Sequence, residues 1–268
     1  MKTKTTKTIT AIAVLAAALT FGSCQKEKTV LKNTDNNATV SVSEQSEFEI
    51  TNALDMAEGT YKTEGCAVIT HDLSVMPHTF IIDYGTGCTQ RDGKVRRGRI
   101  TGTYDAADFS VTGVTINATF DNYFIDARQL VGTTVRYNNG NNNSHHITYS
   151  INSNIQVIEP NSGGSSSFAT LQTLEILAGF GTASKADDVY STTGTTNGTD
   201  LMGDNYVETI TDPLIRKKDI SCSRFFVQGS TDFQVGSQPV KTTNYGTGAC
   251  DNLATLTVNG NTQNIILH

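Results

Sequence analysis

The feature that most constrains the fold of this chain is a long series of short, strand-like segments. From Tyr61 onward, runs rich in Thr, Val, Ile, Phe and Tyr alternate with clusters of Gly, Asn and Asp, as in β-strands joined by turns. No long helix is expected between them to act as a crossover, so the sequence predicts an all-β fold with antiparallel sheets. The expected strands cover residues 79–83, 99–104, 114–120, 132–137, 147–157, 206–210, 225–229, 238–244, 254–258 and 264–267.

Turn residues separate these strands. Asn259-Gly260 lies between two strand-like runs, and this dipeptide readily takes the positive φ angles of a tight type I′ turn. Asp92-Gly93 is expected to form a similar turn before Lys94. The polar runs 138–143 and 161–167 are expected to be long loops that contribute nothing to the core.

The segment before the strands has helical periodicity. Apolar residues recur at helical spacing between Glu47 and Gly59, which predicts one short N-terminal amphipathic helix built on Phe48, Ile50, Ala53, Leu54 and Ala57. The preceding stretch, residues 29–47, is rich in Asn, Ser and Thr and cannot bury enough apolar area to offset chain entropy. We therefore expect a flexible tether before this helix.

The N-terminus has the form of a secretion signal over residues 1–23. Three lysines precede an apolar run that is too short to span a bilayer, and small residues follow it. The next residue is Cys24, so Phe21-Gly22-Ser23-Cys24 resembles a bacterial lipobox, in which lipid is attached to the cysteine. The alternative is an ordinary secretion signal with an incidental cysteine. The expected organisation is a signal peptide (1–23), a lipidated tether (24–47) and a β domain (48–268).

The charge balance is acidic. The full chain has a net charge of -6, and removal of Lys2, Lys4 and Lys7 with the signal leaves 17 basic residues against 26 acidic ones. An acidic surface repels phosphate backbones, so a nucleic-acid partner is not expected.

An internal similarity involves the cysteines. Tyr84-Gly85-Thr86-Gly87 and the word Tyr-Gly-Thr-Gly at 245–248 each have one cysteine upstream and one just downstream, which suggests repeat units around 61–137 and 206–268. Four cysteines in an exported protein indicate two disulfides. The repeat favours Cys66 with Cys88 and Cys222 with Cys250, and cross-pairing between the halves remains an alternative.

Several segments together resemble a family of predicted lipoproteins from Bacteroidetes, over roughly Cys66 to the C-terminus. The resemblance implies an envelope location and this kind of fold, and it supplies no activity. Members often carry an acid in the third position of the Tyr-Gly-x-Gly turn, where this chain has Thr86 and Thr247. The segments that carry the resemblance are 83–88, 93–100, 119–123, 187–190 with Gly194, and 245–252.

One basic cluster stands out in this acidic chain. On a strand, Lys94 and Arg96 would face one side and Arg97 and Arg99 the other, so both faces would reach water or acidic partners. The cluster is a candidate contact for a polyanion such as lipid A phosphates or an acidic glycan, and the alternative is a solvated edge protected by charge. Its members are Arg91, Lys94, Arg96, Arg97 and Arg99.

Catalytic and metal-binding signatures are weak. Neighbouring strand residues point to opposite faces, so His145-His146 would clamp a metal poorly, and His71 and His78 are expected on exposed loops. We find no nucleophile elbow, phosphate loop or zinc signature, so no catalytic residue, metal or cofactor is expected. A pair of aspartates could still serve glycoside hydrolysis, with candidates Asp121, Asp126, Asp187, Asp188 and Asp204.

The sequence therefore predicts a non-enzymatic, lipid-anchored protein of the outer membrane with a binding or structural role. Its expected partners are the membrane, through the lipid anchor, and an envelope protein or glycan, on the periplasmic or the surface side. The alternative is an envelope hydrolase that cleaves glycans through Asp carboxylates. A third reading is an adhesin or assembly subunit with an exchangeable terminal strand.

Overall fold

The computed structural model describes residues 33–58, 66–90, 93–161, 163–182, 186–219, 222 and 225–267. The predicted signal peptide and Cys24 lie outside these residues. The described part consists of a helix followed by strands, namely α1 (Asn33–Ala57), β1 (Val68–Asp72), β2 (His78–Asp83), β3 (Cys88–Thr89), β4 (Val95–Tyr104), β5 (Thr115–Ile125), β6 (Arg128–Asn141), β7 (Ile147–Ile158), β8 (Ser165–Ala178), β9 (Val189–Thr199), β10 (Asn205–Lys217), β11 (Gln228–Val235), β12 (Lys241–Thr247), β13 (Leu253–Val258) and β14 (Asn261–Ile266).

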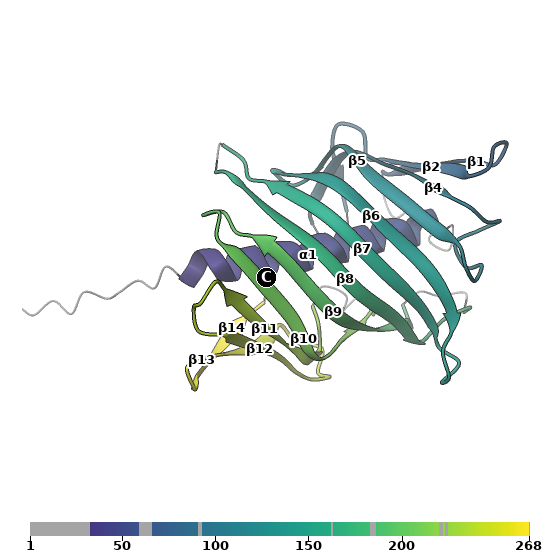
Figure 1. Ribbon diagram of the computed structural model, residues 1–268. Helices are drawn as coiled ribbons and strands as arrows, with labels where there is room; N and C mark the ends of the chain where they lie inside the picture. The colour runs from purple at the N-terminus through teal and green to yellow at the C-terminus, as the bar shows by residue number, and fades with distance from the viewer. Residues whose placement is uncertain are drawn as a thin grey trace, which may run out of the picture. The chain divides into compact units, whose positions relative to one another are not determined.

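The strands form one open antiparallel sheet, so the all-β prediction is confirmed. Its order is β1-β2-β4-β5-β6-β7-β8-β9-β10-β11-β12-β13-β14, and β3 pairs beside β4 (Figure 1). Strands that are consecutive in sequence are therefore neighbours in space almost throughout. A meander of this kind needs short turns and no crossover helices.

Helix α1 lies against the inner face of this sheet (Figure 1). Arg96 of β4, Arg136 of β6 and Arg216 of β10 all reach residues of the helix. The sheet therefore curves around α1, and its other face is the outer face.

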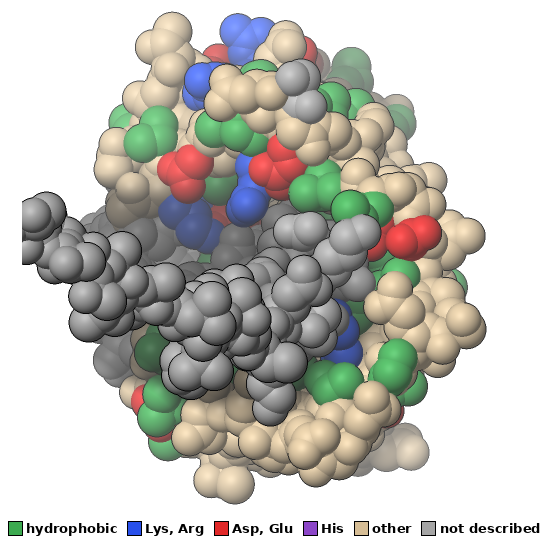
Figure 2. Space-filling view, turned by 90° about the vertical axis from the view of Figure 1, so that its left-hand side faces the viewer, with side chains coloured by type: hydrophobic (Ala, Val, Ile, Leu, Met, Phe, Trp, Pro, Cys, Tyr) green, Lys and Arg blue, Asp and Glu red, His purple; other side chains and the backbone are tan. Residues whose placement is uncertain are grey.

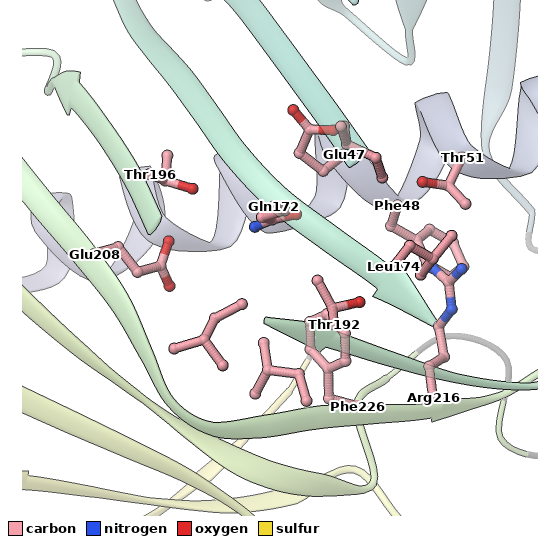
Figure 3. Close-up of a pocket in the computed structure, with 13 residues that line it drawn as sticks. Glu47, Phe48, Thr51, Gln172, Leu174, Thr192, Thr196, Glu208, Arg216 and Phe226 are labelled. Atoms are coloured by element: carbon pink, nitrogen blue, oxygen red, sulfur yellow. The ribbon is translucent and has the colours of Figure 1, made fainter. Parts of the chain in front are cut away.

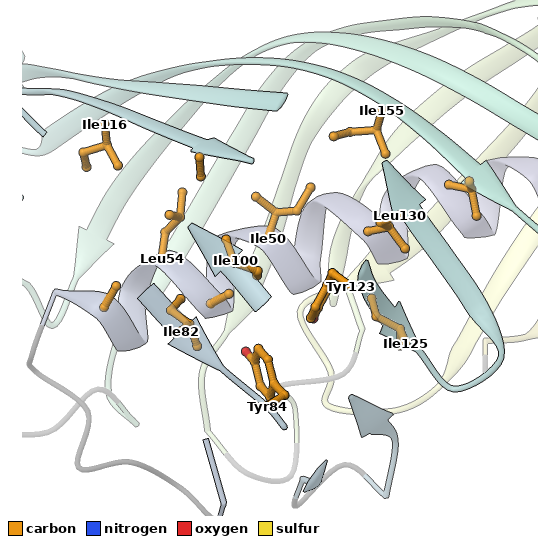
Figure 4. Close-up of a cluster of buried hydrophobic side chains, with 14 of the residues drawn as sticks. Ile50, Leu54, Ile82, Tyr84, Ile100, Ile116, Tyr123, Ile125, Leu130 and Ile155 are labelled. Atoms are coloured by element: carbon orange, nitrogen blue, oxygen red, sulfur yellow. The ribbon is translucent and has the colours of Figure 1, made fainter. Parts of the chain in front are cut away.

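The alternation of buried and exposed residues is clearest in β7, where Ile151 and Ile155 are buried and Asn152 and Asn154 are exposed. This period of two places one apolar side of each strand toward the helix and one polar side toward solvent. The main hydrophobic core lies between α1 and the inner face of the sheet. Ile50 and Leu54 of α1 pack among residues of β2 to β7, including Phe80, Ile82, Ile100, Ile116, Tyr123, Leu130 and Ile155 (Figure 4).

The helix is longer than the sequence predicts. It begins at Asn33, inside the segment that was expected to be an unstructured tether up to residue 47. Ser43, Ser46 and Glu49 are buried although they are polar. The prediction was wrong here because it counted apolar residues alone, whereas polar groups of the sheet also pack against the helix.

The loop predictions at 138–143 and 161–167 are also wrong in part. β6 continues to Asn141, and Asn138 is fully buried, where its amide donates to the backbone carbonyl of Ser110 at 3.0 Å. β8 begins at Ser165, and Ser166 is buried. Buried hydrogen bonds make these polar residues acceptable in a strand. The Asn259-Gly260 turn is confirmed, with φ angles of 50° and 76°.

Both disulfides have the pairing that the repeat favours, Cys66 with Cys88 and Cys222 with Cys250. The two turns beside them are alike in detail, because the Gly85 amide donates to Asp83 at 2.8 Å and the Gly246 amide to Asn244 at 2.9 Å. Tyr84 and Tyr245, which precede the glycines, are both buried.

The likeness of the two turns does not extend to every glycine. Gly85, Gly246 and Gly248 have positive φ angles, but Gly87 does not. The strand order is a single continuous meander. A repeat of whole β units is not shown.

Across the residues that the structure describes, we find no helix with the length and apolarity needed to cross a membrane.

Candidate functional site

The most unusual chemistry of the molecule lies between α1 and the inner face of the sheet, where charged groups are buried in pairs. The carboxylate of Glu49 is almost fully buried and faces two cations of β4 and the turn before it. Arg96 donates its Nε–H to Glu49 at 3.0 Å, and Lys94 donates to the other oxygen at 3.1 Å. One acid of the helix is thus bound to two bases of the sheet.

A second buried cluster forms six residues further along α1, around Asp55. Arg136 of β6 donates to one carboxylate oxygen at 3.0 Å, and the ammonium group of Lys218, just after β10, donates to the other. The hydroxyl of Tyr190 lies 3.2 Å from Asp55 and 3.0 Å from Asp188. Asp55, Arg136 and Lys218 are each less than a tenth exposed.

The neighbouring charges determine how Asp55 titrates. Burial by itself would raise its pKa, but the positive charges and hydrogen bonds of Lys218 and Arg136 outweigh burial and hold the pKa well below its usual range. Burial lowers the pKa of Lys218, and Asp55 offsets part of this effect. Burial, together with the charges of both acids, raises the pKa of Tyr190. Asp55 is therefore ionised at neutral pH, and Tyr190 remains a hydrogen-bond donor.

A small cavity lies between α1 and the inner face of β7 to β10 (Figure 3). Its volume is about 40 Å³, enough for a few water molecules but not for an organic ligand. Glu47 and Phe48 of α1 line it together with residues of β8, β9 and β10, including Gln172, Thr196, Glu208 and Arg216. The guanidinium of Arg216 lies 4.4 Å from the centre of the Phe48 ring.

Glu47 is the least compensated acid in this cavity. Neither carboxylate oxygen has a hydrogen-bond partner among the described residues. Burial raises the pKa of Glu47 to about 7, and the nearby hydroxyls of Ser153 and Thr170 limit the rise. Burial therefore favours the protonated form of Glu47 over the carboxylate.

A more open hollow lies at the other side of Glu49. It has a volume of about 310 Å³, within the range of small-molecule sites, and Lys94, Asp126, Arg128 and Glu159 contribute charged groups to its lining. Arg128 and Glu159 are paired with each other at 2.9 Å. Most of the charge at this hollow is therefore neutralised within the protein.

The structure separates the predicted basic cluster into two pairs. Lys94 and Arg96 point inward and are bound to Glu49, so Arg96 is too buried to touch a surface partner while α1 is in place. Arg97 stacks over the ring of Phe124 at 3.8 Å, and Arg99 pairs with Asp83 at 2.9 Å. Arg91 lies outside the described residues. The expectation that both faces of this segment reach water is wrong for the inner face.

Figure 2 shows that Lys and Arg side chains on the face in view lie beside Asp and Glu side chains. They do not gather there into a separate basic patch. A polyanion contact through the exposed Arg97 and Arg99 stays a prediction.

The predicted aspartates do not form an accessible pair. Asp121 lies 3.9 Å from Arg99, Asp126 accepts the backbone N–H of Val95, and Asp187 accepts the hydroxyl of Thr182. Asp204 is exposed, whereas Asp188 is completely buried.

The histidines are scattered. His71 contacts the Tyr104 hydroxyl at 3.1 Å, and His146 pairs with Glu175 at 2.7 Å. Within the described ranges, no group of three or more His, Cys, Asp or Glu residues is placed to hold a metal ion.

Sequence reasoning singled out only part of the buried clusters, namely Lys94, Arg96 and Asp188. It did not single out Glu49, Asp55, Arg136 or Lys218. Two features of the sequence could have pointed to the clusters. Acidic residues at 47, 49 and 55 lie among the apolar residues of the helix, and isolated basic residues lie within apolar strands. These features do not predict which acid pairs with which base, because the contacts join residues up to 163 positions apart.

Comparisons with known proteins add no relative: no family model, no curated protein and no solved structure matches this chain.

Proposed function

We propose that this protein is a non-enzymatic, lipid-anchored protein of the outer membrane that binds a partner through the surface of its sheet. Lipid on Cys24 would hold it at the membrane, on the periplasmic or the surface side. An envelope protein or an envelope glycan is the expected partner. The resemblance to predicted Bacteroidetes lipoproteins supports the same location.

The observation that carries this proposal is that α1 covers the inner face of the sheet. The concave side of a curved sheet is where a ligand or substrate would be enclosed, and here α1 occupies it. The bases that could act on a substrate there, Arg96, Arg136 and Lys218, are bound to Glu49 and Asp55 of the helix. Contact with a partner is therefore left to the outer face and the edges.

A glycan hydrolase remains the second candidate, because two carboxylates do meet in the structure. The Tyr190 hydroxyl lies within hydrogen-bond distance of one oxygen of Asp55, at 3.2 Å, and one of Asp188, at 3.0 Å, so the two carboxylates lie close together, as a catalytic pair must. Both are buried, however, and Asp55 is held by two cations. A substrate would reach them only if α1 moved away.

Fractionation of cells tests the anchor. The wild-type chain should sediment with membranes and take up an alkyne fatty acid, and Cys24→Ala should move to the soluble fraction without label. Retention of the variant on membranes would contradict lipid anchoring.

Two further measurements test the binding role. The full chain should capture a partner from detergent-solubilised envelopes, and it should release no new reducing ends from envelope polysaccharide. Sustained release that disappears in Asp188→Asn would favour the hydrolase instead.

A further inference from the structure

The outer face of the central strands is unusual because it carries almost no charge. β7 and β9 contain no Lys, Arg, Asp or Glu. β8 contains a single one, Glu175, which is paired with His146 at the end of the strand. Exposed faces of antiparallel sheets are commonly polar. Here, in an acidic chain, the polar groups are hydroxyls and amides.

A hollow of about 360 Å³ lies on this face, across β7, β8, β9 and β10. The strand register places Asn154, Ala169, Asn197 and Val207 in one row across the four strands. Ala169 has the shortest side chain of this row, so it forms the floor between two amides. The next row on one side contains Leu171, which is 61% exposed and lies outside the lining of the hollow.

The adjacent row on the other side adds further polar groups. Ser167, Thr199 and Asn205 are cross-strand neighbours, and the hydroxyls of Ser167 and Thr199 are 2.8 Å apart. This bond holds the two hydroxyls in place, and each retains acceptor capacity toward the hollow.

The amides of the hollow are not engaged by the part of the chain that the structure describes. Among the described residues, the side chains of Asn154, Asn197 and Asn205 have no hydrogen-bond partner, although all three line the hollow. Each amide offers two donors and one acceptor. Strands lie about 4.8 Å apart, so Asn154 and Asn197, two strands apart, hold their amides roughly 10 Å from each other.

We infer that this hollow binds a neutral oligosaccharide, a conclusion that rests on the proposed binding role and names its ligand class. Sugar hydroxyls both donate and accept, as do the three amides and two hydroxyls of the site. The apolar surfaces of Ala169 and Val207 in the lining suit the C–H faces of sugar rings.

The absence of charge selects against other ligands. A phosphate or a carboxylated glycan would find no cation in the lining, and an acidic or basic peptide would find no opposite charge. The exposed apolar area is confined to isolated side chains, which is too little to attract a lipid surface.

Affinity electrophoresis of the full chain, in a polyoxyethylene detergent, tests this site. Native gels would contain dextran, mannan or galactan as neutral probes and hyaluronan as an anionic probe. We expect retardation by at least one neutral polysaccharide and none by hyaluronan. Retardation by hyaluronan alone, or by none of the four, would overturn the inference.

Variants locate the binding. Asn154→Ala and Asn197→Ala should each weaken the retarding interaction at least fivefold, because each removes hydrogen bonds to the sugar. Ala169→Lys should abolish it by filling the floor with a long charged side chain. Asn117→Ala is the matched control, since Asn117 is exposed on the same face in β5, away from the hollow. Equal effects of the control and the site variants would place the sugar elsewhere.

The same samples separate this inference from the proposed role. New reducing ends in the retarding polysaccharide would contradict the non-enzymatic role and leave the sugar site standing. Loss of sugar binding in Asn154→Ala with unchanged partner capture from envelopes would support the sugar site and show that the partner uses another surface.

Discussion

Asp55 shows how much of the stability of this molecule depends on single buried charges. Its carboxylate joins α1 to two bases that are distant in sequence, and all three groups are shielded from water. A buried pair of this kind adds little over an apolar contact, but removal of one partner leaves an uncompensated charge. We therefore expect this buried residue to be important for the stability of the fold.

Asp55→Asn should lower the free energy of unfolding by about 3–5 kcal/mol, because Arg136 and Lys218 then lose the buried carboxylate that binds both of them. Denaturant unfolding at pH 7 measures this loss. Asp121→Asn, at a site that is 53% exposed, is the control and should change stability by less than about 0.5 kcal/mol. Equal effects at both sites would mean that the Asp55 cluster is solvated.

The raised pKa of Glu47 predicts that the free energy of unfolding decreases as the pH rises. An acid in an ion pair, such as Asp55, has the opposite effect. The pKa of Glu47 rises from 4.5 in the unfolded chain to about 7 in the folded one, so the folded state binds the proton more tightly. The associated stability is fully present below pH 4.5 and is lost as the pH rises through 7. The loss amounts to roughly 3 kcal/mol.

Glu47→Gln should remove this part of the pH dependence. Unfolding curves at pH 4.5 and 8 would show similar stability for both proteins at pH 4.5, where the side chain is uncharged in each. The variant should be more stable at pH 8. A parallel decline of both proteins would show that Glu47 is accessible to water.

At the scale of the elements, close backbone contacts determine where glycine is needed. Gly98 of β4 has a φ angle of 82°, and a Cβ placed there would lie 1.9 Å from the carbonyl oxygen of Asn122. Asn122 also has positive φ and lies at a register shift between β4 and β5. The bulge turns Tyr123 inward, where it packs in the main core against Tyr84.

Gly98→Ala should therefore lower stability by roughly 3 kcal/mol or more, since both backbone strain and a steric clash result. Gly93→Ala is the matched control, because Gly93 has a φ angle of 81° with nothing within 4 Å of its added Cβ. It should lose only about 1–2 kcal/mol. Thermal unfolding of both variants gives the comparison, and similar losses would contradict the close approach.

The disulfides are a second feature of this scale. Each closes a loop of 22 or 28 residues at one end of the strand series. Removal of the bridge between Cys66 and Cys88 by a double substitution to Ala should cost about 3 kcal/mol by loop-closure entropy. Denaturant unfolding of the double variant checks the value, and non-reducing peptide mapping of the wild type should show both bridges.

At the scale of the whole molecule, α1 and the sheet share one core and two ion-pair clusters. A helix that fills the inner face in this way should not unfold separately from the strands around it. Native-state hydrogen exchange should give residues 47–57 of α1 and the central strands β6 and β7 similar free energies of opening. Much faster exchange in α1 would show that the helix leaves the sheet independently.

The sequence by itself determined the local features of this protein. Alternation predicts the antiparallel strands, Asn259-Gly260 predicts its turn, and the similar contexts of Cys66 and Cys222 predict both disulfides. These features depend on residues close together in the chain or on a repeated pattern. The strands β8 and β9 were missed because β8 begins with three serines and Ser, Thr and Gly make up most of β9, and these residues are also typical of loops.

Only the tertiary structure decided which charged side chains form pairs and which face of the sheet remains available for binding. Asp55 bonds with residues 81 and 163 positions away, and no local pattern encodes such a pairing. The length of α1 depends likewise on polar partners that the sheet supplies. The row of Asn154, Ala169 and Asn197 is assembled by strand register across three strands. Charge compensation and strand register are properties of the folded sheet. The sequence contains these residues, but it does not show which of them come into contact.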